Sequence, residues 1–211
     1  MLAESATKAQ ALIRDPSHFQ WYLVPLLLLV LHAYGEQAAE RRWSVVLGGL
    51  AFWLMDWINE IANGLLARFS GFAPLWGAPG GSAYVLLIGL NVEISMMFAI
   101  MGLFAVRTLP ADRHLKFFGI NNRYWFASIN AALCVMVECW LNHIGVLTWE
   151  WPFWGLRAAW LIFLIGYLPF FAVAYWVHDM ASLRRKLTIV GVLAAVVVCL
   201  LGVFSGVLGW I

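Results

Sequence analysis

Charged residues are scarce in this sequence. They make up 11% of its 211 residues, whereas an average soluble domain has about 25%. Hydrophobic residues make up 64%, and the mean hydropathy is +0.84. This composition excludes an ordinary soluble domain and indicates a chain that crosses a membrane several times. The net charge of only +2 argues against a nucleic-acid partner and leaves the lipid bilayer as the expected surroundings.

Cysteine and the common catalytic motifs are also rare or absent. Cys134, Cys139 and Cys199 lie in apolar segments without a CxxC spacing, so they are expected to be small hydrophobic residues rather than disulfide or zinc ligands. The chain has no Gly-rich phosphate loop, no HExxH motif and no nucleophile-elbow serine. No cofactor is therefore expected, and a single metal ion held by carboxylates and a histidine is left open.

Long apolar segments are what the sequence has in quantity. With their flanks, six of them are long enough to cross a bilayer as helices: residues 21–35, 43–66, 82–106, 124–147, 156–177 and 187–211. Residues 1–20 are predicted to form an N-terminal segment with a short interfacial helix at 6–14. The predicted fold class is all-α, a polytopic integral membrane helical bundle of six transmembrane helices in a single domain over residues 21–211.

Lys and Arg are distributed unevenly among the loops. The loops after the first, third and fifth predicted spans hold nine of them: Arg41, Arg42, Arg107, Arg113, Lys116, Arg123, Arg184, Arg185 and Lys186. The other side holds four: Lys8, Arg14, Arg68 and Arg157. Because basic loops stay in the cytoplasm, both termini are predicted on the outer side. If residues 21–35 lie in the interface instead, the bundle has five spans and the N-terminus is cytoplasmic.

The second predicted span carries a polar stripe. Asp56, Asn59, Glu60 and Asn63 are spaced i, i+3, i+4 and i+7, which puts them on one face of a helix. An acid at the centre of a membrane helix costs roughly 2.5–3.5 kcal/mol, so this face is expected to look away from lipid. The sequence therefore predicts a buried acidic site.

Two further acids lie inside predicted spans. They are Glu93 and Glu138, and from their depth both are expected to converge with Asp56 near the bilayer midplane. No Lys accompanies these carboxyl groups, so they cannot all be ionised, and at least one is expected to be protonated near neutral pH. A protonated acid in an apolar pocket can serve as a general acid. The predicted catalytic residues are Asp56, Glu60, Glu93 and Glu138, with Glu60 or Asp56 as the acid.

Aromatic and amide residues on the same spans are candidates for the wall of a substrate pocket. The predicted pocket residues are Trp53, Trp57, Asn59, Asn63, Trp140, Asn142 and His143. Aromatic faces attract cations, which suits a carbocation-like intermediate or a cationic ligand. Each of these residues also has a plainer interpretation as packing or as a hydrogen-bonded partner inside the bundle.

A short internal repeat links the second and fourth predicted spans. Residues 57–61 read Trp-Ile-Asn-Glu-Ile, and residues 140–144 read Trp-Leu-Asn-His-Ile. Each segment is followed by a Pro-x-Trp-Gly sequence, at residues 74–77 and 152–155. Two spans that run in the same direction and share such a motif are typical of a parallel repeat about an axis along the membrane normal.

The sequence is compatible with three classes of function. The favoured one is a membrane enzyme that acts on a hydrophobic, isoprenoid- or sterol-like substrate by acid–base chemistry, such as cyclisation, isomerisation or hydration. A non-catalytic subunit of a membrane complex and a proton- or cation-coupled transporter are the alternatives, and a homo-oligomer or a complex partner fits either. The general plan is similar to that of small polytopic terpene cyclases, but no motif of theirs maps onto these positions, so no residue role is taken from that likeness.

Overall fold

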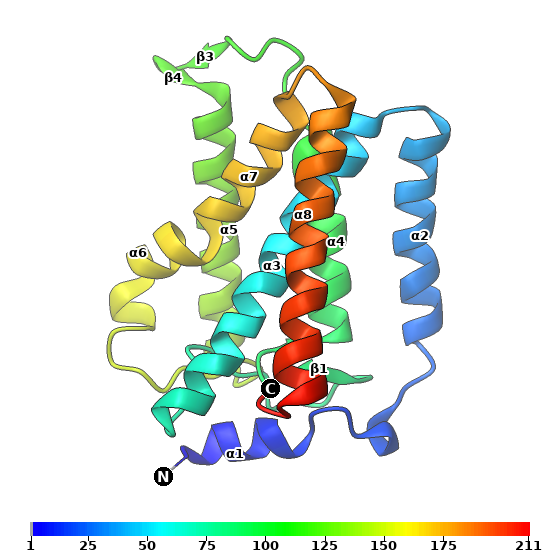
Figure 1. The fold of residues 1–211 in the computed structure, drawn as a ribbon. Helices are drawn as coiled ribbons and strands as arrows, with labels where there is room; N and C mark the ends of the chain where they lie inside the picture. The colour runs from blue at the N-terminus through cyan, green and yellow to red at the C-terminus, as the bar shows by residue number, and fades with distance from the viewer. Residues whose placement is uncertain (1) are drawn as a thin grey trace.

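The computed structural model describes residues 2–211, and most of them are helical (Figure 1). Four helical segments are long and apolar enough to cross a membrane: Trp43–Ser70, Asn122–His143, Leu156–Asp179 and Leu183–Val207. The protein is therefore an all-α, multi-pass membrane protein, as its composition predicts. Two shorter helices, α2 (Leu23–Ala39) and α4 (Val92–Arg107), have 17 and 16 residues and lie where the first and third spans were predicted.

Helix α3 (Trp43–Ser70) forms the centre of the bundle. Helices α4, α7 (Leu168–Asp179) and α8 (Leu183–Leu201) all pack against it. Small residues allow α3 and α4 to approach closely, because a Cβ at Gly102 would lie 2.7 Å from the Phe52 Cβ and 2.9 Å from the Gly49 carbonyl oxygen. Because one face of α3 is covered by α4 at this crossing, another face of α3 points toward α5 (Asn122–His143).

Helix α5 stands on the far side of the bundle. It packs against α7 and against the segment before α7, and it has no comparable contact with α4. One contact does join α4 and α5, where the Cys134 thiol lies 3.4 Å from the Met101 sulfur. The space between α3, α4, α5 and the α7 segment is therefore only partly filled by helix packing.

The segment before α7 is irregular. It consists of η2 (Leu156–Ala158), α6 (Ala159–Leu161) and a π-helical turn, η3 (Ile162–Tyr167). Pro169 follows the turn and has no N–H to donate to the preceding turn of the helix, and such prolines and π-turns are common causes of a helix irregularity. Pro169 itself lies in the first turn of α7, directly after the π-turn. A second π-turn, η4 (Gly202–Val207), ends the last span.

The prediction that residues 82–91 begin a membrane helix is wrong. These residues contain a β-hairpin, β1 (Val85–Leu87) and β2 (Leu90–Asn91), and α4 begins only at Val92. The Asn91 side chain accepts a hydrogen bond from the Ile94 N–H at 2.8 Å and so caps the helix. Periodicity does not separate a short apolar strand from a buried helix, which is why the hairpin was missed.

A second hairpin precedes α5 at the opposite end of the bundle (Figure 1). It consists of β3 (Lys116–Phe117) and β4 (Ile120–Asn121), with Gly119 at a φ of 81° in the turn. Asn121 caps α5 by accepting from the Arg123 N–H at 2.9 Å. Both hairpins have the same pattern of two apolar residues, Gly, one apolar residue and Asn (87–91 and 117–121).

Both described ends of the chain lie at one end of the bundle (Figure 1). Helix α1 (Glu4–Ala11) lies there, roughly across the axes of the long helices, and a short turn, η1 (Pro16–His18), leads toward α2. The predicted helix at 6–14 thus begins and ends earlier than expected. Its location at a membrane interface stays a prediction.

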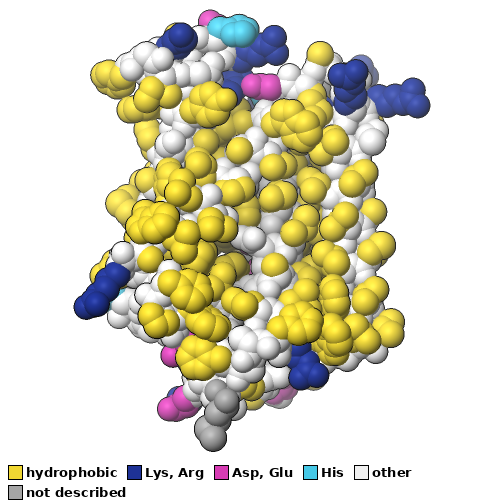
Figure 2. Space-filling view, turned by 60° about the vertical axis from the view of Figure 1, so that its left-hand side comes forward, with side chains coloured by type: hydrophobic (Ala, Val, Ile, Leu, Met, Phe, Trp, Pro, Cys, Tyr) yellow, Lys and Arg dark blue, Asp and Glu magenta, His cyan; other side chains and the backbone are white. Residues whose placement is uncertain are grey.

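The surface matches a bilayer environment. Figure 2 shows hydrophobic side chains over the middle of one face, with most Lys and Arg side chains toward the two ends. Helix α5 contributes exposed apolar side chains along its length: Tyr124, Ile129, Leu133, Met136, Val137 and Trp140. These side chains face lipid in a bundle that lies in a membrane.

Candidate functional site

In the polar stripe of α3, Asp56, Glu60 and Asn63 are buried and Asn59 is half-buried, and the stripe divides into two parts. Asp56, Asn59 and Glu60 line a cavity of about 220 Å³. Asn63 lies one turn further along and holds the following loop instead. Its Nδ2 donates to the Trp76 carbonyl at 2.8 Å, and its Oδ1 accepts from the Leu75 N–H at 2.7 Å.

That loop carries Trp76 to the cavity. The Trp76 indole Nε1 donates to the Glu60 Oε1 at 2.7 Å, which holds the carboxyl group in place. Gly89, in the turn of the first hairpin, lies directly against the same group, since a Cβ there would be 2.7 Å from the Glu60 Oε2. A loop and a hairpin that are distant from Glu60 in the sequence thus fix its position.

A third carboxyl group reaches the cavity from α5. Glu138 is buried, accepts from the Trp149 Nε1 at 3.0 Å, and lies beside the Tyr167 hydroxyl of the π-turn. Glu138 and Glu60 are close enough to interact electrostatically, as are Glu60 and Asp56. Two helices therefore bring three acids to one cavity.

The rest of the cavity wall is apolar or aromatic. The further lining residues are Trp76, Gly89, Ile94, Met97, Phe98, Met101, Leu133, Cys134, Val137, Leu141, Leu147, Trp154, Ile162, Gly166, Tyr167 and Phe170. Within residues 2–211, no Lys, Arg or His side chain lines it. Ionised carboxylates are costly to bury without a partner charge, so this cavity favours either neutral carboxyl groups or a cation from outside the chain.

Two of these carboxyl groups also have oxygens without hydrogen-bond partners. Among the residues that the structure describes, the Asp56 Oδ2 and the Glu60 Oε2 have none, and neither does the nearby Trp154 Nε1. Asp56 and Glu60 are each only 3% exposed. Buried polar groups are nearly always hydrogen-bonded, so unpaired ones at a cavity wall point to a ligand or water.

The cavity opens sideways, between α4 and α5. Met97 on α4 and Leu133 and Val137 on α5 line it and are also 45–48% exposed. The Met101–Cys134 contact lies beside this opening and joins the two helices there. Because the opening lies between two apolar helix surfaces, it faces the hydrocarbon region of a surrounding bilayer.

Glu93 does not join the other acids, so its predicted place at the common centre is wrong. Since α4 begins at Val92, Glu93 lies in the first turn of the helix rather than in the middle of a span. Its carboxylate accepts from the Tyr22 hydroxyl, from the Ser82 Oγ at 2.7 Å and from the Ala83 N–H at 2.6 Å. These bonds tie the hairpin and the start of α2 to α4.

Several predicted pocket residues also lie elsewhere. Trp53 and Trp57 line a separate apolar groove beside α2, and the Trp53 Nε1 donates to the Ser95 Oγ at 2.9 Å. Trp140 is 59% exposed and points out of the bundle, and His143 is exposed at the end of α5. The Asn142 Nδ2 donates to the Leu147 carbonyl at 2.9 Å and so closes the turn after α5. Of the seven predicted pocket residues, only Asn59 lines the cavity.

Trp76, Trp154, Trp149 and Tyr167 were missed as site residues. The repeat did contain a signal, because Trp76 and Trp154 occupy the same place in its two Pro-x-Trp-Gly sequences. In the structure these two rings pack together at the cavity, with centroids 5.7 Å apart. Of the two tryptophan pairs that the repeat matches, Trp76 and Trp154 therefore meet at the cavity, whereas Trp57 and Trp140 lie on other surfaces.

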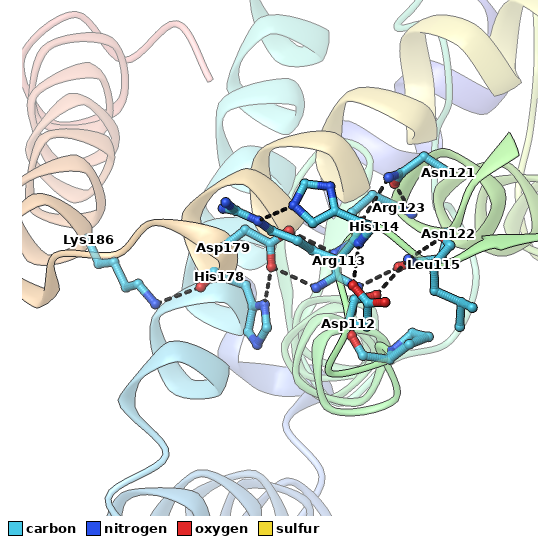
Figure 3. A network of polar contacts seen from close by, with 11 residues as sticks. Asp112, Arg113, His114, Leu115, Asn121, Asn122, Arg123, His178, Asp179 and Lys186 are labelled. Carbon is cyan, nitrogen blue, oxygen red and sulfur yellow. Dashed lines mark hydrogen bonds and ion pairs between the residues drawn. The ribbon is translucent and has the colours of Figure 1, made fainter.

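A separate polar network lies at the other end of the bundle, near the β3–β4 hairpin (Figure 3). The Arg123 guanidinium makes a bidentate ion pair with Asp179, with both N–O distances 2.8 Å. His178 Nδ1 lies 2.8 Å from Asp179, and the Lys186 ammonium donates to the His178 carbonyl at 2.6 Å. The network joins α5, α7 and α8 at this end of the bundle.

The structure also bears on the metal site that the sequence left open. In the described part of the chain, no group of three or more His, Cys, Asp or Glu side chains is arranged to hold a metal ion. The three cavity acids therefore do not form a ligand set of that kind.

Comparisons with known proteins complete this description. An uncharacterized protein from Archaeoglobus fulgidus is 49% identical over 211 residues, which is the whole of both chains. A second uncharacterized protein from the same organism is 51% identical over 51 residues, 24% of this chain and 91% of that one. No solved structure matches the chain. The model of a family described as "Uncharacterized membrane protein family" matches residues 3–206, and the chain belongs to this family.

Proposed function

We propose that the protein is a membrane-embedded enzyme that performs acid–base chemistry on a hydrophobic, lipid-soluble substrate of the isoprenoid or sterol type. The observation that carries the proposal is the convergence of Asp56, Glu60 and Glu138 on an apolar cavity that opens between α4 and α5. A substrate dissolved in the bilayer reaches such a cavity without passing through water. A transporter of water-soluble ions or solutes opens toward water, so an opening toward lipid supports the enzyme.

The hydrogen bonds suggest a role for each acid. The Asp56 Oδ2 receives none from the described residues, which favours the neutral form of this carboxyl group, and Asp56 is the proposed proton donor. Glu138 receives one from Trp149 and lies beside the Tyr167 hydroxyl, an arrangement that stabilises a carboxylate and suits a base. Glu60 lies between them in charge contact with both and can carry a proton from one to the other.

The proposed step is the movement of a double bond, or its cyclisation or hydration. Asp56 transfers its proton to one carbon of a substrate double bond, which leaves a carbocation beside the aromatic side chains of the cavity. Glu138 then removes a proton from a neighbouring carbon, or from a water that attacks the cation. Proton transfer from Glu138 through Glu60 returns Asp56 to its neutral form, so atoms and charge balance over one turnover.

The same proposal includes a topology of six spans with both termini outside. Helices α2 and α4 supply the two shorter crossings, since at 1.5 Å per residue 16–17 residues extend about 25 Å, close to the hydrocarbon thickness of about 30 Å. Nine of the thirteen Lys and Arg residues lie in the loops that follow α2, α4 and α7 or at the helix ends that border these loops. Support for this orientation comes from the cytoplasmic preference of basic loops.

The experiment measures proton transfer to carbon without knowledge of the substrate. The purified protein in nanodiscs is incubated with a membrane lipid extract in D₂O buffer, and deuterium at carbon in isoprenoid and sterol-like lipids is measured by mass spectrometry. Asp56→Asn, Glu60→Gln and Glu138→Gln are each expected to lower incorporation by about 10²–10⁴-fold, the usual effect of losing an acid or base. Glu93→Gln is the matched control, since this acid lies outside the cavity. No incorporation by the wild type, or full incorporation by all three amide variants, would refute the proposal.

A further inference from the structure

The charge of the cavity is one-sided. Three acids line it, and in the described chain no Lys, Arg or His side chain does. Arg68, near the end of α3, and Arg157, in η2, do not line the cavity. A bound cation would supply the charge that the protein itself leaves out.

Unpaired atoms give a second, independent indication of a ligand. The Asp56 Oδ2 and the Glu60 Oε2 accept no hydrogen bond from the described residues, although both side chains are 97% buried. A carboxylate oxygen accepts hydrogen bonds from an ammonium group and attracts its charge. An ammonium group that carries hydrogens can therefore donate hydrogen bonds to both oxygens and also balance their negative charge. A quaternary ammonium group balances the charge but donates no hydrogen bond.

The aromatic walls fit a cation as well. Trp76 and Trp154 pack together with their centroids 5.7 Å apart, and Phe98 and Tyr167 stack at 6.2 Å. All four side chains line the cavity. Indole, phenol and phenyl faces attract cations, most strongly where water is excluded.

The size and the opening of the cavity indicate the rest of the ligand. A volume of about 220 Å³ is below the 300–1,000 Å³ typical of pockets for drug-sized ligands, so a polar head fits and a long tail does not. The tail must leave between α4 and α5, past Met97 and Val137, which are apolar and face the bilayer. The Met101–Cys134 contact beside this exit limits its width, which favours a single chain.

We propose that the cavity binds the ammonium head of a single-chain cationic amphiphile, whose tail passes between α4 and α5 into the bilayer. The inference rests on the same cavity as the proposed function, and it does not depend on any reaction there. In an enzyme of the proposed kind, such a molecule occupies the place of the positively charged intermediate and acts as an inhibitor.

The test compares three probes with the same tail. Wild-type protein in nanodiscs of neutral lipid is titrated with radiolabelled dodecylamine, dodecanol or dodecanoate at pH 7, and empty nanodiscs correct for partition into lipid. Saturable binding of dodecylamine, at least about ten-fold tighter than that of dodecanol, is the expected result. Equal affinity for the alcohol, or tighter binding of the carboxylate, would overturn the proposal, and this comparison needs no variant to fold.

Variants then locate the binding site. Asp56→Asn and Glu138→Gln are each expected to weaken dodecylamine binding by about ten-fold, whereas Glu93→Gln leaves it unchanged. Met97→Trp narrows the exit and weakens binding, while Met136→Trp, an exposed position of α5 outside the cavity, is its matched control. Each variant is first checked for wild-type elution and unfolding temperature. Unchanged binding in both acid variants that pass this check would place the site elsewhere and refute the proposal.

The experiments distinguish failure of the proposed reaction from failure of the proposed ligand site. Acid-dependent dodecylamine binding without deuterium incorporation into any lipid supports the ligand site and removes the proposed chemistry. Incorporation that requires Asp56, together with no preference for the amine over the alcohol, supports the chemistry and removes the ligand site.

Discussion

Asn63 offers the sharpest test of how the site is built, because its effect on stability is measurable without a substrate. Its side chain is 2% exposed and makes two short hydrogen bonds, to the Leu75 N–H at 2.7 Å and to the Trp76 carbonyl at 2.8 Å. Asn63→Ala leaves both backbone groups without a partner in a half-buried loop. Each such group costs about 1–3 kcal/mol, and partial access of water favours the lower half of that range, so the expected loss is about 2–4 kcal/mol.

The assay follows unfolding by circular dichroism in detergent. In a chain of this length, 1 kcal/mol corresponds to about 2–4 °C, so the unfolding temperature of Asn63→Ala is expected to fall by about 4–16 °C. Limited proteolysis should also cut the loop at 71–81 faster in the variant, since the loop has lost its anchor. Asn59→Ala is the matched control, because Asn59 lies one turn away on α3 and lines the cavity instead of holding the loop. Equal losses for the two variants, or a loss below about 1 kcal/mol for Asn63→Ala, would refute this reasoning.

Three other predictions concern the hairpin turn, the polar network and the topology. Gly89→Ala places a Cβ 2.6 Å from the Asn63 Nδ2 and 2.7 Å from the Glu60 Oε2, so it should lower the free energy of unfolding by about 1–3 kcal/mol. The control Gly81→Ala has open space around its Cβ and should leave stability unchanged. Equal effects of the two variants in thermal unfolding would contradict the close approach at Gly89. Arg123→Gln removes the bidentate pair with Asp179 and should cost about 1.5–3 kcal/mol in the same assay, and an unchanged unfolding temperature would show that the network is dispensable. In cells, a cysteine introduced by Arg113→Cys should react with a membrane-impermeant maleimide only after permeabilisation, and labelling of intact cells at this position would reverse the proposed orientation.

The sequence by itself determined the class of the protein and the buried face of α3. Few charges and long apolar segments leave a membrane bundle as the stable state, because unpaired backbone groups in lipid must be satisfied inside helices. The 3.6-residue period put Asp56, Asn59, Glu60 and Asn63 on one face before any contact was known. The cost of an acid in lipid then required that face to be buried, and the structure buries Asp56, Glu60 and Asn63.

The first hairpin shows where local pattern stops being sufficient. Residues 82–91 are apolar enough for a helix, and only their pairing as β1 and β2 decides that α4 begins at Val92. This boundary moves Glu93 from the middle of a span to its end, where it binds Ser82 and the Ala83 backbone. The repeated Gly and Asn of the two hairpins is a local signal that turn chemistry can recognise, since Gly suits a tight turn and Asn caps a helix.

Only the tertiary structure decided which side chains meet at the cavity. Trp57 and Trp140 hold equal places in the repeat, yet Trp57 lines the groove beside α2 and Trp140 faces outward. The reason is that the helices packed around α3 differ from those packed around α5, so equal sequence positions have different surroundings. The Trp76 indole reaches Glu60 through a loop that Asn63 holds, and Tyr167 reaches Glu138 through a π-turn before Pro169. Such contacts depend on where distant segments pack, and helical periodicity carries information only about the face of a single helix.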